Sequence, residues 1–278
     1  MLHLSRSPAF EVYARQIVRE CGRAGIEARE ERLTGGPSAG RIRDRLRQLS
    51  ADPGVDGIIV QQPLPRGIPP AAVAEGLDAS RDVDGITPLD VGLLATGQAA
   101  FAPATAEAVA EILDRTGVRL EGLHAVVVGR SHVVGRPVAQ LLLRRHCTVT
   151  ICHSRTRDLA SHTRRADVLV VAAGRPGLVT GDMLRPGAIV VDVGTTVVEG
   201  RIVGDVEPES ARRVAAVLTP VPGGVGPVTN AILVEHVLRA ARARRRSAGR
   251  ARSAAGQEAR VDQLVHRDGV RDEVLRQR

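Results

Sequence analysis

The chain has 278 residues and a formal net charge of +8, and this length predicts two domains rather than one. Its only aromatic residues are Phe10, Tyr13 and Phe101, which argues against base-stacking nucleic-acid modules and suits aliphatic parallel sheets covered by helices. No apolar run approaches the roughly 20 residues that span a bilayer, and the N-terminus is too short and polar for a signal peptide. We therefore expect a soluble protein without membrane contact.

The basic residues and the cysteines limit which proton acceptors, metal sites and disulfides the chain can have. The sequence contains no Lys, and every strong base is Arg, which cannot lose a proton to act as a base. From Arg242 onward eleven Arg face five acids, so +6 of the net charge of +8 lies in the tail. Cys21, Cys147 and Cys152 show no metal-ligand spacing, and an odd number makes no disulfide framework. We expect no metal site and a cytoplasmic location.

The first part of the chain predicts an α/β layer. Apolar residues recur at helical spacing between residues 8 and 25. A charged helix is expected around residues 41–49, followed by a buried strand at 55–60. The chain then turns, passes through residues 82–85 and enters a helix near residues 105–116.

Strands and helices alternate in the second part of the chain. A strand at 124–128 meets a glycine-containing turn and a helix through 141–143, and further apolar strands are expected at 148–152, 168–172 and 188–193. This alternation predicts a doubly wound parallel sheet with its ligand at the carboxyl ends of the strands. A helix at about 229–243 is expected to pack back on the body. Residues 244–278 are rich in Arg, Ala and Ser and predict a mostly disordered tail.

Four motifs stand in order along the chain. They are Val60-Gln61-Gln62-Pro63-Leu64-Pro65, Asp82-Val83-Asp84-Gly85, Val128-Gly129-Arg130-Ser131 with Val134-Gly135-Arg136-Pro137, and Pro220-Val221-Pro222-Gly223-Gly224-Val225-Gly226-Pro227. Together they cover roughly residues 2–240 and resemble the bifunctional methylenetetrahydrofolate dehydrogenase/methenyltetrahydrofolate cyclohydrolase family. The resemblance implies one-carbon derivatives of tetrahydrofolate as substrates, which periodicity alone does not reveal.

The resemblance also implies an organisation. An α/β folate-binding catalytic domain would cover residues 1–103 and be completed by the helix at about 229–243. A Rossmann-like NADP-binding domain would cover residues 104–228, and two copies would form a homodimer through it. Residues 244–278 stay outside both domains.

Three residues of the folate pocket are expected to be catalytic by this resemblance: Tyr13 as a stacking floor, Gln61 as an orienting amide and Asp84 as the group that holds the pterin. Further substrate-binding residues are Ile17, Val60, Gln62, Pro222, Gly223, Gly224, Val225 and Gly226. Taken singly, Asp84 also fits a turn-capping carboxylate, and Gln61 also fits a hydrogen-bonding group at the end of a strand. Glycines in the last segment permit close backbone approach to a ligand, although a plain turn would use them too.

The cofactor residues follow two strands. Gly129, Arg130 and Ser131 lie where a strand ends and a helix starts, so their N–H groups can face a pyrophosphate. Alone, this segment fits an ordinary turn equally well. NAD-preferring folds place an acid after the next strand, whereas this chain has Ser154 there, which with Arg130 favours NADP. Thr195 lies where the family's backbone approaches the nicotinamide.

One family residue is replaced. The family carries a Lys four residues after the Tyr, on the same helix face, and here Ile17 follows Tyr13 at that spacing. Hydride transfer needs placement of two carbons and no proton acceptor, so dehydrogenase activity is expected to remain. Hydrolysis of the methenyl product needs a base worth about 10²- to 10⁴-fold, and we expect that step to be impaired.

Other departures leave alternatives open. The family's Asn after residues 82–85 is Asp90 here, its Ser before the Tyr is Phe10, and members carry an extra helix and most of a first strand before the point where this chain starts. Either the start is wrongly assigned or the first domain lacks an edge element. One alternative is therefore an inactive paralogue that binds NADP or folate.

A second alternative assigns the Arg-rich tail to nucleic acid or an acidic partner, although such tails without aromatic residues are commonly solvated extensions. A hydroxy-acid dehydrogenase is a third alternative, but the sequence lacks the His and Arg constellation that it would need.

Overall fold

The computed structural model describes residues 1–5, 8–33, 36–62, 64–98 and 101–247. The chain divides into two compact units, Met1–Val237 and Leu238–Arg278. In the second unit the described residues are 238–247, and they are helical. The rest of the expected disordered tail, residues 248–278, lies outside the described residues. Within the described ranges, no helix combines the length and apolar character that a membrane span requires.

A five-stranded parallel sheet organises the second half of the first unit. Its strands are β3 (His124–Val128), β4 (Thr148–Cys152), β5 (Val168–Val171), β6 (Ile189–Asp192) and β9 (Val217–Leu218). They lie in the order β4-β3-β5-β6-β9, and every neighbouring pair is parallel. The expected doubly wound parallel sheet is therefore present.

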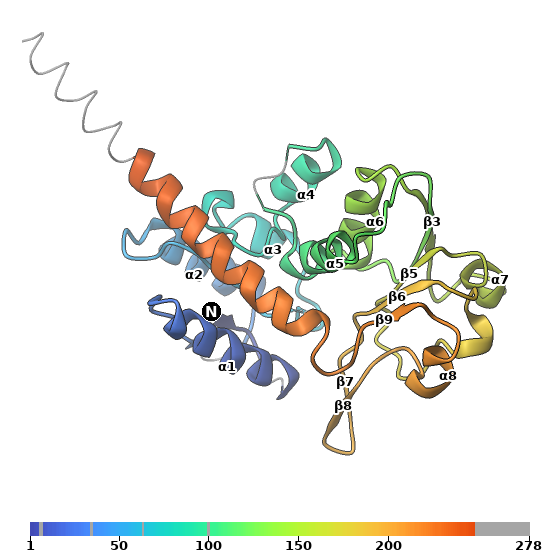
Figure 1. The fold of residues 1–278 in the computed structure, drawn as a ribbon. Helices are drawn as coiled ribbons and strands as arrows, with labels where there is room; N and C mark the ends of the chain where they lie inside the picture. The colour runs from blue at the N-terminus through green and yellow to red at the C-terminus, as the bar shows by residue number, and fades with distance from the viewer. Residues whose placement is uncertain (6–7, 34–35, 63, 99–100, 248–278) are drawn as a thin grey trace, which may run out of the picture. The chain divides into compact units, whose positions relative to one another are not determined.

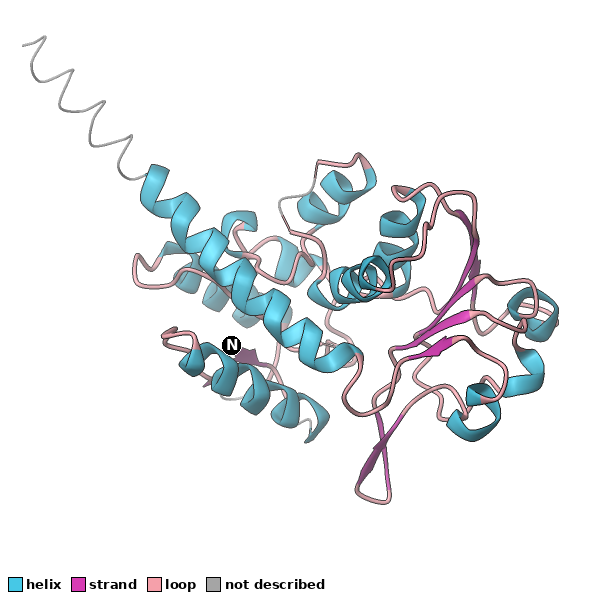
Figure 2. Cartoon of the chain, viewed as in Figure 1, coloured by secondary structure: helices cyan, strands magenta, loops and turns pink. Residues whose placement is uncertain are grey.

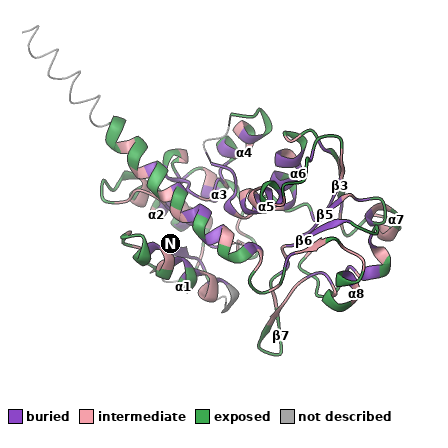
Figure 3. Cartoon of the chain, viewed as in Figure 1, coloured by how far each residue is buried: buried purple, intermediate pink, exposed green. Residues whose placement is uncertain are grey.

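Helices cover both faces of this sheet. Figure 1 shows α5 (Ala104–Arg115) and α6 (Gly135–Leu143) on one side, and α7 (Leu159–Thr163) and α8 (Pro208–Arg212) on the other. Because both faces are covered, all residues of β5 and β6 are buried, as Figure 3 shows for the centre of the sheet. These strands consist almost wholly of Val, Ile and Leu, whose side chains gain about 1.5–3 kcal/mol each from full burial.

The strand order creates a switch point between β3 and β5. From β3 the chain goes to β4 on one side, and then to β5, β6 and β9 on the other. In such sheets, ligands bind in the crevice outside the carboxyl ends of the strands at this point. Gly129 directly follows β3, and a Cβ atom on it would lie 2.2 Å from the Ala172 carbonyl oxygen beyond β5. A side chain at residue 129 would therefore close the crevice.

The N-terminal segments form a smaller parallel sheet. β1 (Leu2–His3) pairs in parallel with β2 (Glu31–Arg32). Single parallel bridges join Leu2 to Val60 and Ile58 to Asp82. The strand expected at 55–60 is thus reduced to bridging residues, because its partners are too short to extend a ladder. β1 lies between β2 and Val60, so it is not the edge of this sheet.

Helices and short turns of helix surround this layer (Figure 2). They are α1 (Pro8–Arg23), α2 (Ala39–Ala51), α3 (Ala71–Ala74), η1 (Ala79–Arg81) and α4 (Pro88–Ala95). Leu46 and Ile42 of α2 are fully buried against Leu2, Ile58 and Val60. The remaining elements are η2 (Gly181–Met183) and the antiparallel hairpin of β7 (Thr196–Val198) and β8 (Arg201–Val203).

A long helix begins after the last strand, and residues 225–247 are helical. Its residues up to 237 belong to the first unit, where His236 is fully buried. The His236 ring lies 2.8 Å from the Val83 carbonyl oxygen through Nδ1 and 2.9 Å from the Glu107 carboxylate through Nε2. This histidine therefore connects the helix to α5 and to the segment that carries Asp82 and Asp84.

Candidate active site

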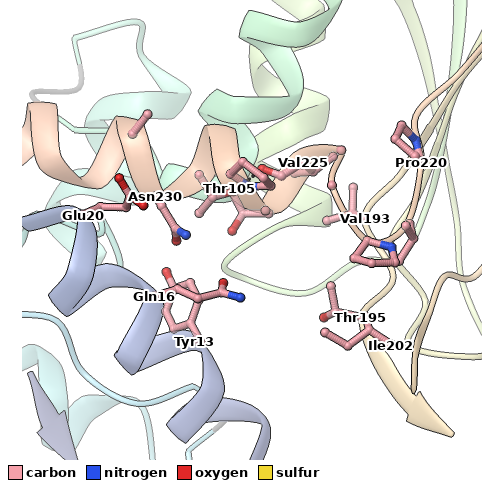
Figure 4. Close-up of a pocket in the computed structure, with 18 of the residues that line it drawn as sticks. Tyr13, Gln16, Glu20, Thr105, Val193, Thr195, Ile202, Pro220, Val225 and Asn230 are labelled. Atoms are coloured by element: carbon pink, nitrogen blue, oxygen red, sulfur yellow. Dashed lines mark hydrogen bonds between the residues drawn. The ribbon is translucent and has the colours of Figure 1, made fainter. Parts of the chain in front are cut away.

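A pocket of about 880 Å³ lies in the first unit. This volume falls within the range of small-molecule sites. Its walls come from α1, from the loop that follows β6, and from residues 220–234 (Figure 4). Six of the expected substrate residues line it: Tyr13, Pro222, Gly223, Gly224, Val225 and Gly226. Of the expected cofactor residues, Thr195 lines it.

One face of α1 forms a polar wall. Tyr13, Gln16 and Glu20 line the pocket, and their i, i+3, i+7 spacing places them along one side of a helix. Ile17, by contrast, is 1% exposed, lies in the core and is absent from the lining. The sequence analysis missed Gln16 and Glu20 because it followed only the i+4 position; extending the spacing from Tyr13 by i+3 and i+7 would have found them.

Tyr13 and Asp84 lie close enough to influence each other. Burial raises the pKa of the Tyr13 phenol well above its usual value, and the Asp84 carboxylate raises it further. Tyr13 is therefore a neutral phenol at physiological pH. Burial raises the pKa of Asp84 to about 6, against the opposing effects of the Ala104 N–H and of His236.

The Asp84 carboxylate also has a structural role. Its Oδ1 accepts the N–H of Ala104, the first residue of α5, at 3.4 Å. This contact agrees with the turn-capping interpretation of Asp84 and uses only one carboxylate oxygen. Asp84 is not among the residues that line the pocket.

Gln61 is engaged within the small sheet. Its Oε1 accepts the N–H groups of Leu4 at 2.7 Å and Ser5 at 3.0 Å, and its Nε2 donates to the Ser5 hydroxyl at 3.0 Å. The side chain is 2% exposed, as the strand-end interpretation predicts. Val60 is buried, Gln62 is half-buried, and neither they nor Gln61 line the pocket.

The loop at residues 220–226 requires its glycines. Gly223 has a φ of +102°, in the region that favours glycine. A Cβ atom on Gly224 would lie 2.5 Å from the Pro220 carbonyl oxygen. The Val221–Pro222 peptide bond is cis. The loop therefore presents its backbone directly to the pocket.

The expected cofactor residues gather at one edge of the large sheet. Val128 of β3 and Cys152 of β4 are paired in parallel register, so Arg130 and Ser154 each follow a paired residue by two positions. Both are exposed. The Ser131 hydroxyl accepts the N–H groups of Val134 at 3.1 Å and Gly135 at 3.3 Å, at the start of α6.

Close packing at this turn fits a dinucleotide. A Cβ atom on Gly135 would lie 2.2 Å from the Gly129 carbonyl oxygen. The backbone at the end of β3 therefore packs directly against the backbone at the start of α6. A cation, two hydroxyls and a helix start at one sheet edge match the needs of a phosphorylated ribose and a pyrophosphate. None of Gly129, Arg130, Ser131 or Ser154 lines the pocket at α1.

Buried carboxylates fix the loops near Thr195. Asp192 accepts the N–H groups of Gly194, Asp205 and Val206 at 2.9–3.0 Å. Asp205 accepts those of Ala173 at 2.6 Å and Gly174 at 2.8 Å. The loops after β5 and β6 are thereby held by the protein itself. The sequence analysis missed this pair, because nothing in the strand pattern signals it.

A second buried acidic pair lies beside Asp84. The Asp82 carboxylate accepts the Thr87 N–H at 2.6 Å, and the Thr87 hydroxyl donates to Asp90 at 2.8 Å. The Thr87 residue thus connects the two carboxylates. Burial raises the pKa of both, that of Asp82 to about 7, and the charges of Asp84 and Asp90 add to the shift of Asp82.

Replacing Asp90 with Asn is expected to stabilise the protein at alkaline pH. A raised folded-state pKa means that the fold favours the protonated acid, so this stability is present below the unfolded pKa and is lost as pH rises through about 7. The amide is neutral at every pH and can donate to Asp82. Urea unfolding should show a gain of about 1–3 kcal/mol at pH 8 and a smaller gain at pH 5, because the loss begins above the unfolded pKa.

Glu199→Gln, on the exposed turn between β7 and β8, removes the same charge and is the matched control. If the Asp90→Asn protein loses as much stability between pH 5 and pH 8 as the wild type, ionisation of the Asp82–Asp90 pair does not destabilise the fold.

Comparison with known proteins identifies the family of the chain. The family model described as "Tetrahydrofolate dehydrogenase/cyclohydrolase, catalytic domain" matches residues 1–84, and the model of that family's NAD(P)-binding domain matches residues 103–245. The bifunctional protein FolD of Nocardia farcinica is 53% identical over 235 residues, 84% of this chain and 83% of the relative. FolD of Moorella thermoacetica is 47% identical over 240 residues, 86% of each chain.

Solved structures support the same family assignment. The bifunctional FolD enzyme of Campylobacter jejuni superimposes with a TM-score of 0.83 at 39% identity, covering 87% of both chains. The Trypanosoma brucei dehydrogenase-cyclohydrolase, solved with NADP cofactor and inhibitor, gives 0.81 at 36% identity, covering 86% of this chain and 84% of that one. The α/β fold and the family predicted from the sequence are both confirmed. The chain belongs to the tetrahydrofolate dehydrogenase/cyclohydrolase family.

Proposed function

We propose that the protein is an NADP-dependent 5,10-methylenetetrahydrofolate dehydrogenase. A hydride passes from the methylene carbon to NADP⁺ and leaves 5,10-methenyltetrahydrofolate. One observation carries the proposal: a single pocket brings Tyr13 and the loop at 222–226, expected to bind folate, together with Thr195, expected to lie at the nicotinamide.

The residues contribute placement rather than proton transfer. Tyr13, as a neutral phenol, offers a flat aromatic face to the substrate. Asp84, with a pKa of about 6, is largely ionised at neutral pH and can accept hydrogen bonds from a pterin. NADP⁺ supplies the hydride acceptor. Holding the methylene carbon and the nicotinamide in the correct geometry can provide a large share of the acceleration of hydride transfer.

The phosphate contacts support NADP over NAD. Arg130 and Ser154 at neighbouring strand ends offer a cation and a hydroxyl to a 2′-phosphate, and Ser131 lies at the start of α6 between the turn and the helix. The Trypanosoma brucei relative was solved with NADP, which agrees with this choice.

The cyclohydrolase step is impaired in this proposal. Ile17 has no proton to exchange, and the chain has no Lys to replace the missing base. Glu20 lines the pocket, and its carboxylate is paired with the Arg23 guanidinium at 2.8 Å. Water attack on the methenyl group therefore lacks its usual assistance.

An inactive paralogue that binds NADP or folate is the second candidate. The engagement of the Gln61 amide by Leu4 and Ser5 favours it, because an amide that orients substrate must exchange those partners first.

A pair of absorbance assays separates these functions. The dehydrogenase should form NADPH from methylenetetrahydrofolate and leave added methenyltetrahydrofolate to decay at its uncatalysed rate. Accelerated decay would contradict the impaired second step. Silence in the first assay, with NADP still bound, would establish the inactive paralogue.

The organisation of the chain is part of the proposal. It consists of a folate-binding domain at 1–103, completed by the helix at about 229–243, and an NADP-binding domain at 104–228. The family models, which match residues 1–84 and 103–245, support a boundary near residue 103, but the second model also includes the helix that the proposal assigns to the folate-binding domain. A homodimer through the NADP-binding domain is supported by exposed apolar side chains on that domain: Leu143, Ile151 on edge strand β4, Val197 and Val198. Three buried free thiols suit a cytoplasmic location.

A further inference from the structure

We propose that His236 is a positioning residue for Asp84: as an imidazolium it joins the Val83 carbonyl to the Glu107 carboxylate and so holds Asp84 in place for the pterin. The inference rests on the proposed function, in which Asp84 holds the pterin. It assigns a role in substrate binding to a side chain that does not line the pocket.

His236 is a polar residue in a buried part of the long helix. Its side chain is 1% exposed, and Leu233 and Ala240, about one turn away on either side, are buried with it. Phe101 packs against the ring, with the two ring centroids 4.8 Å apart. A titratable group this far from water needs partners for its polar atoms, and both ring nitrogens have one.

The two hydrogen bonds fix the protons on the His236 ring. The Val83 carbonyl oxygen can only accept, so Nδ1 carries a proton. A neutral ring protonated at Nδ1 has no proton at Nε2, so the 2.9 Å contact between Nε2 and the Glu107 carboxylate needs one more proton. Imidazole is a stronger base than a carboxylate, and the Glu107 side chain is 34% exposed. The additional proton therefore lies on the ring, which makes His236 an imidazolium.

These hydrogen bonds reach Asp84 by two routes. Val83 directly precedes Asp84, so the bond to its carbonyl fixes the backbone beside the acid. Glu107 lies on α5 three residues after Ala104, whose N–H donates to Asp84 Oδ1 at 3.4 Å. The ring thus ties together the backbone that carries the carboxylate and the helix that binds it.

The charge of the ring also favours the ionised form of Asp84. Burial raises the pKa of Asp84 to about 6, and the Ala104 N–H and the charge of His236 oppose that rise. The Arg81 guanidinium donates to the carbonyl oxygens of residues 49, 52 and 55. The other titratable groups around Asp84 are one neutral phenol and three acids: Tyr13, Asp82, Asp90 and Glu107.

An ionised Asp84 is the better partner for the substrate. Hydrogen bonds from N–H groups to a carboxylate are roughly twice as strong as those to a neutral acceptor, and a pterin offers N–H groups. Affinity for folate should therefore fall as acidification protonates Asp84, with its midpoint near pH 6. Loss of the positive charge on His236 should move that midpoint to higher pH.

Calorimetric titration of the full chain with tetrahydrofolate carrying one glutamate tests this role at pH 6 and pH 8.5. His236→Asn keeps an N–H donor near the position of Nδ1 and removes the charge and the bond to Glu107. The midpoint should rise from about pH 6 to about pH 7. Affinity should fall about 5-fold at pH 6 and less than about 2-fold at pH 8.5, where Asp84 is ionised in both proteins.

A second substitution makes the test independent of how well the first variant folds. His236→Gln brings its amide to the position of Nε2 instead, keeps a partner for Glu107 and loses the same charge. It should raise the midpoint as His236→Asn does.

Two further variants separate this effect from damage to the fold. Leu233→Ala opens a cavity one turn away on the same helix, and should change the affinity by the same factor at both pH values. In an Asp84→Asn background, His236→Asn should also change the affinity by the same factor at both pH values, because the acid on which the ring acts is absent.

Three results overturn the inference. They are a midpoint that neither His236 variant moves, a pH-dependent effect of His236→Asn that persists in the Asp84→Asn background, and a wild type that binds no tetrahydrofolate. Failure of the proposed function is separate: it shows as the expected pH pattern of folate binding without NADPH formation.

Discussion

Replacing Ile17 with Lys is expected to raise the hydrolysis of 5,10-methenyltetrahydrofolate about 10²- to 10⁴-fold above the wild type. Residue 17 lies one position after Gln16 and four after Tyr13, but its side chain is in the core. A lysine can place its alkyl stem there and extend its amine toward the pocket. Partial burial lowers the pKa of such an amine, which makes it a base near neutral pH.

Ile17→Met is the matched control, since it has a flexible stem of similar volume and no amine. It should leave the decay of the methenyl compound at the uncatalysed rate. The measurement is the fall of methenyltetrahydrofolate absorbance with and without enzyme, at equal folded protein. If the Ile17→Lys protein folds but hydrolyses methenyltetrahydrofolate no faster than the wild type, the cyclohydrolase step lacks more than this base.

Replacing Gly129 with Ala is expected to weaken NADP binding about 10- to 100-fold, the equivalent of about 1–3 kcal/mol. The new Cβ would lie 2.2 Å from the Ala172 carbonyl oxygen, and the residue has a φ of +137°, so the turn must move away from β5. Strain of this kind costs about 1–3 kcal/mol, and thermal melting should fall accordingly.

Gly122→Ala is the control that separates the effect of backbone strain from that of a steric clash. Gly122 also has a positive φ, +80°, and precedes β3, but a Cβ atom there meets nothing within 4 Å. It should lose stability and keep its affinity for NADP, measured by calorimetry. Equal NADP affinities in the two variants would contradict the proposed cofactor site.

The large sheet could be predicted from the sequence because its strands are buried on both faces. β3 and β4 coincide with the predicted 124–128 and 148–152, and β5 and β6 begin or end one residue inside the predicted ranges. β1, β2 and β9 have two residues each, too few for any periodicity, and only tertiary pairing reveals them. The bridges at Ile58 and Val60 show the same limit.

The candidate site was only partly accessible to sequence reasoning. The loop at 222–226 and Tyr13 came from motifs, and the structure brings them into one pocket. Which side of α1 faces that pocket depends on how the helix packs. Ile17 is buried in the core, and Gln16 and Glu20 face the pocket. His236 could not be recognised, since an isolated His in a helix carries no pattern.

The carboxylates of Asp192 and Asp205 join the loops after β5 and β6 to the segment after β8 through five backbone N–H groups. These loops therefore have their partners within the protein, and the nicotinamide end of the proposed site does not depend on a ligand for its shape. A cofactor that docks there loses little entropy to loop ordering, so more of its contact energy remains as affinity. The protein thus resembles a rigid receptor at this end.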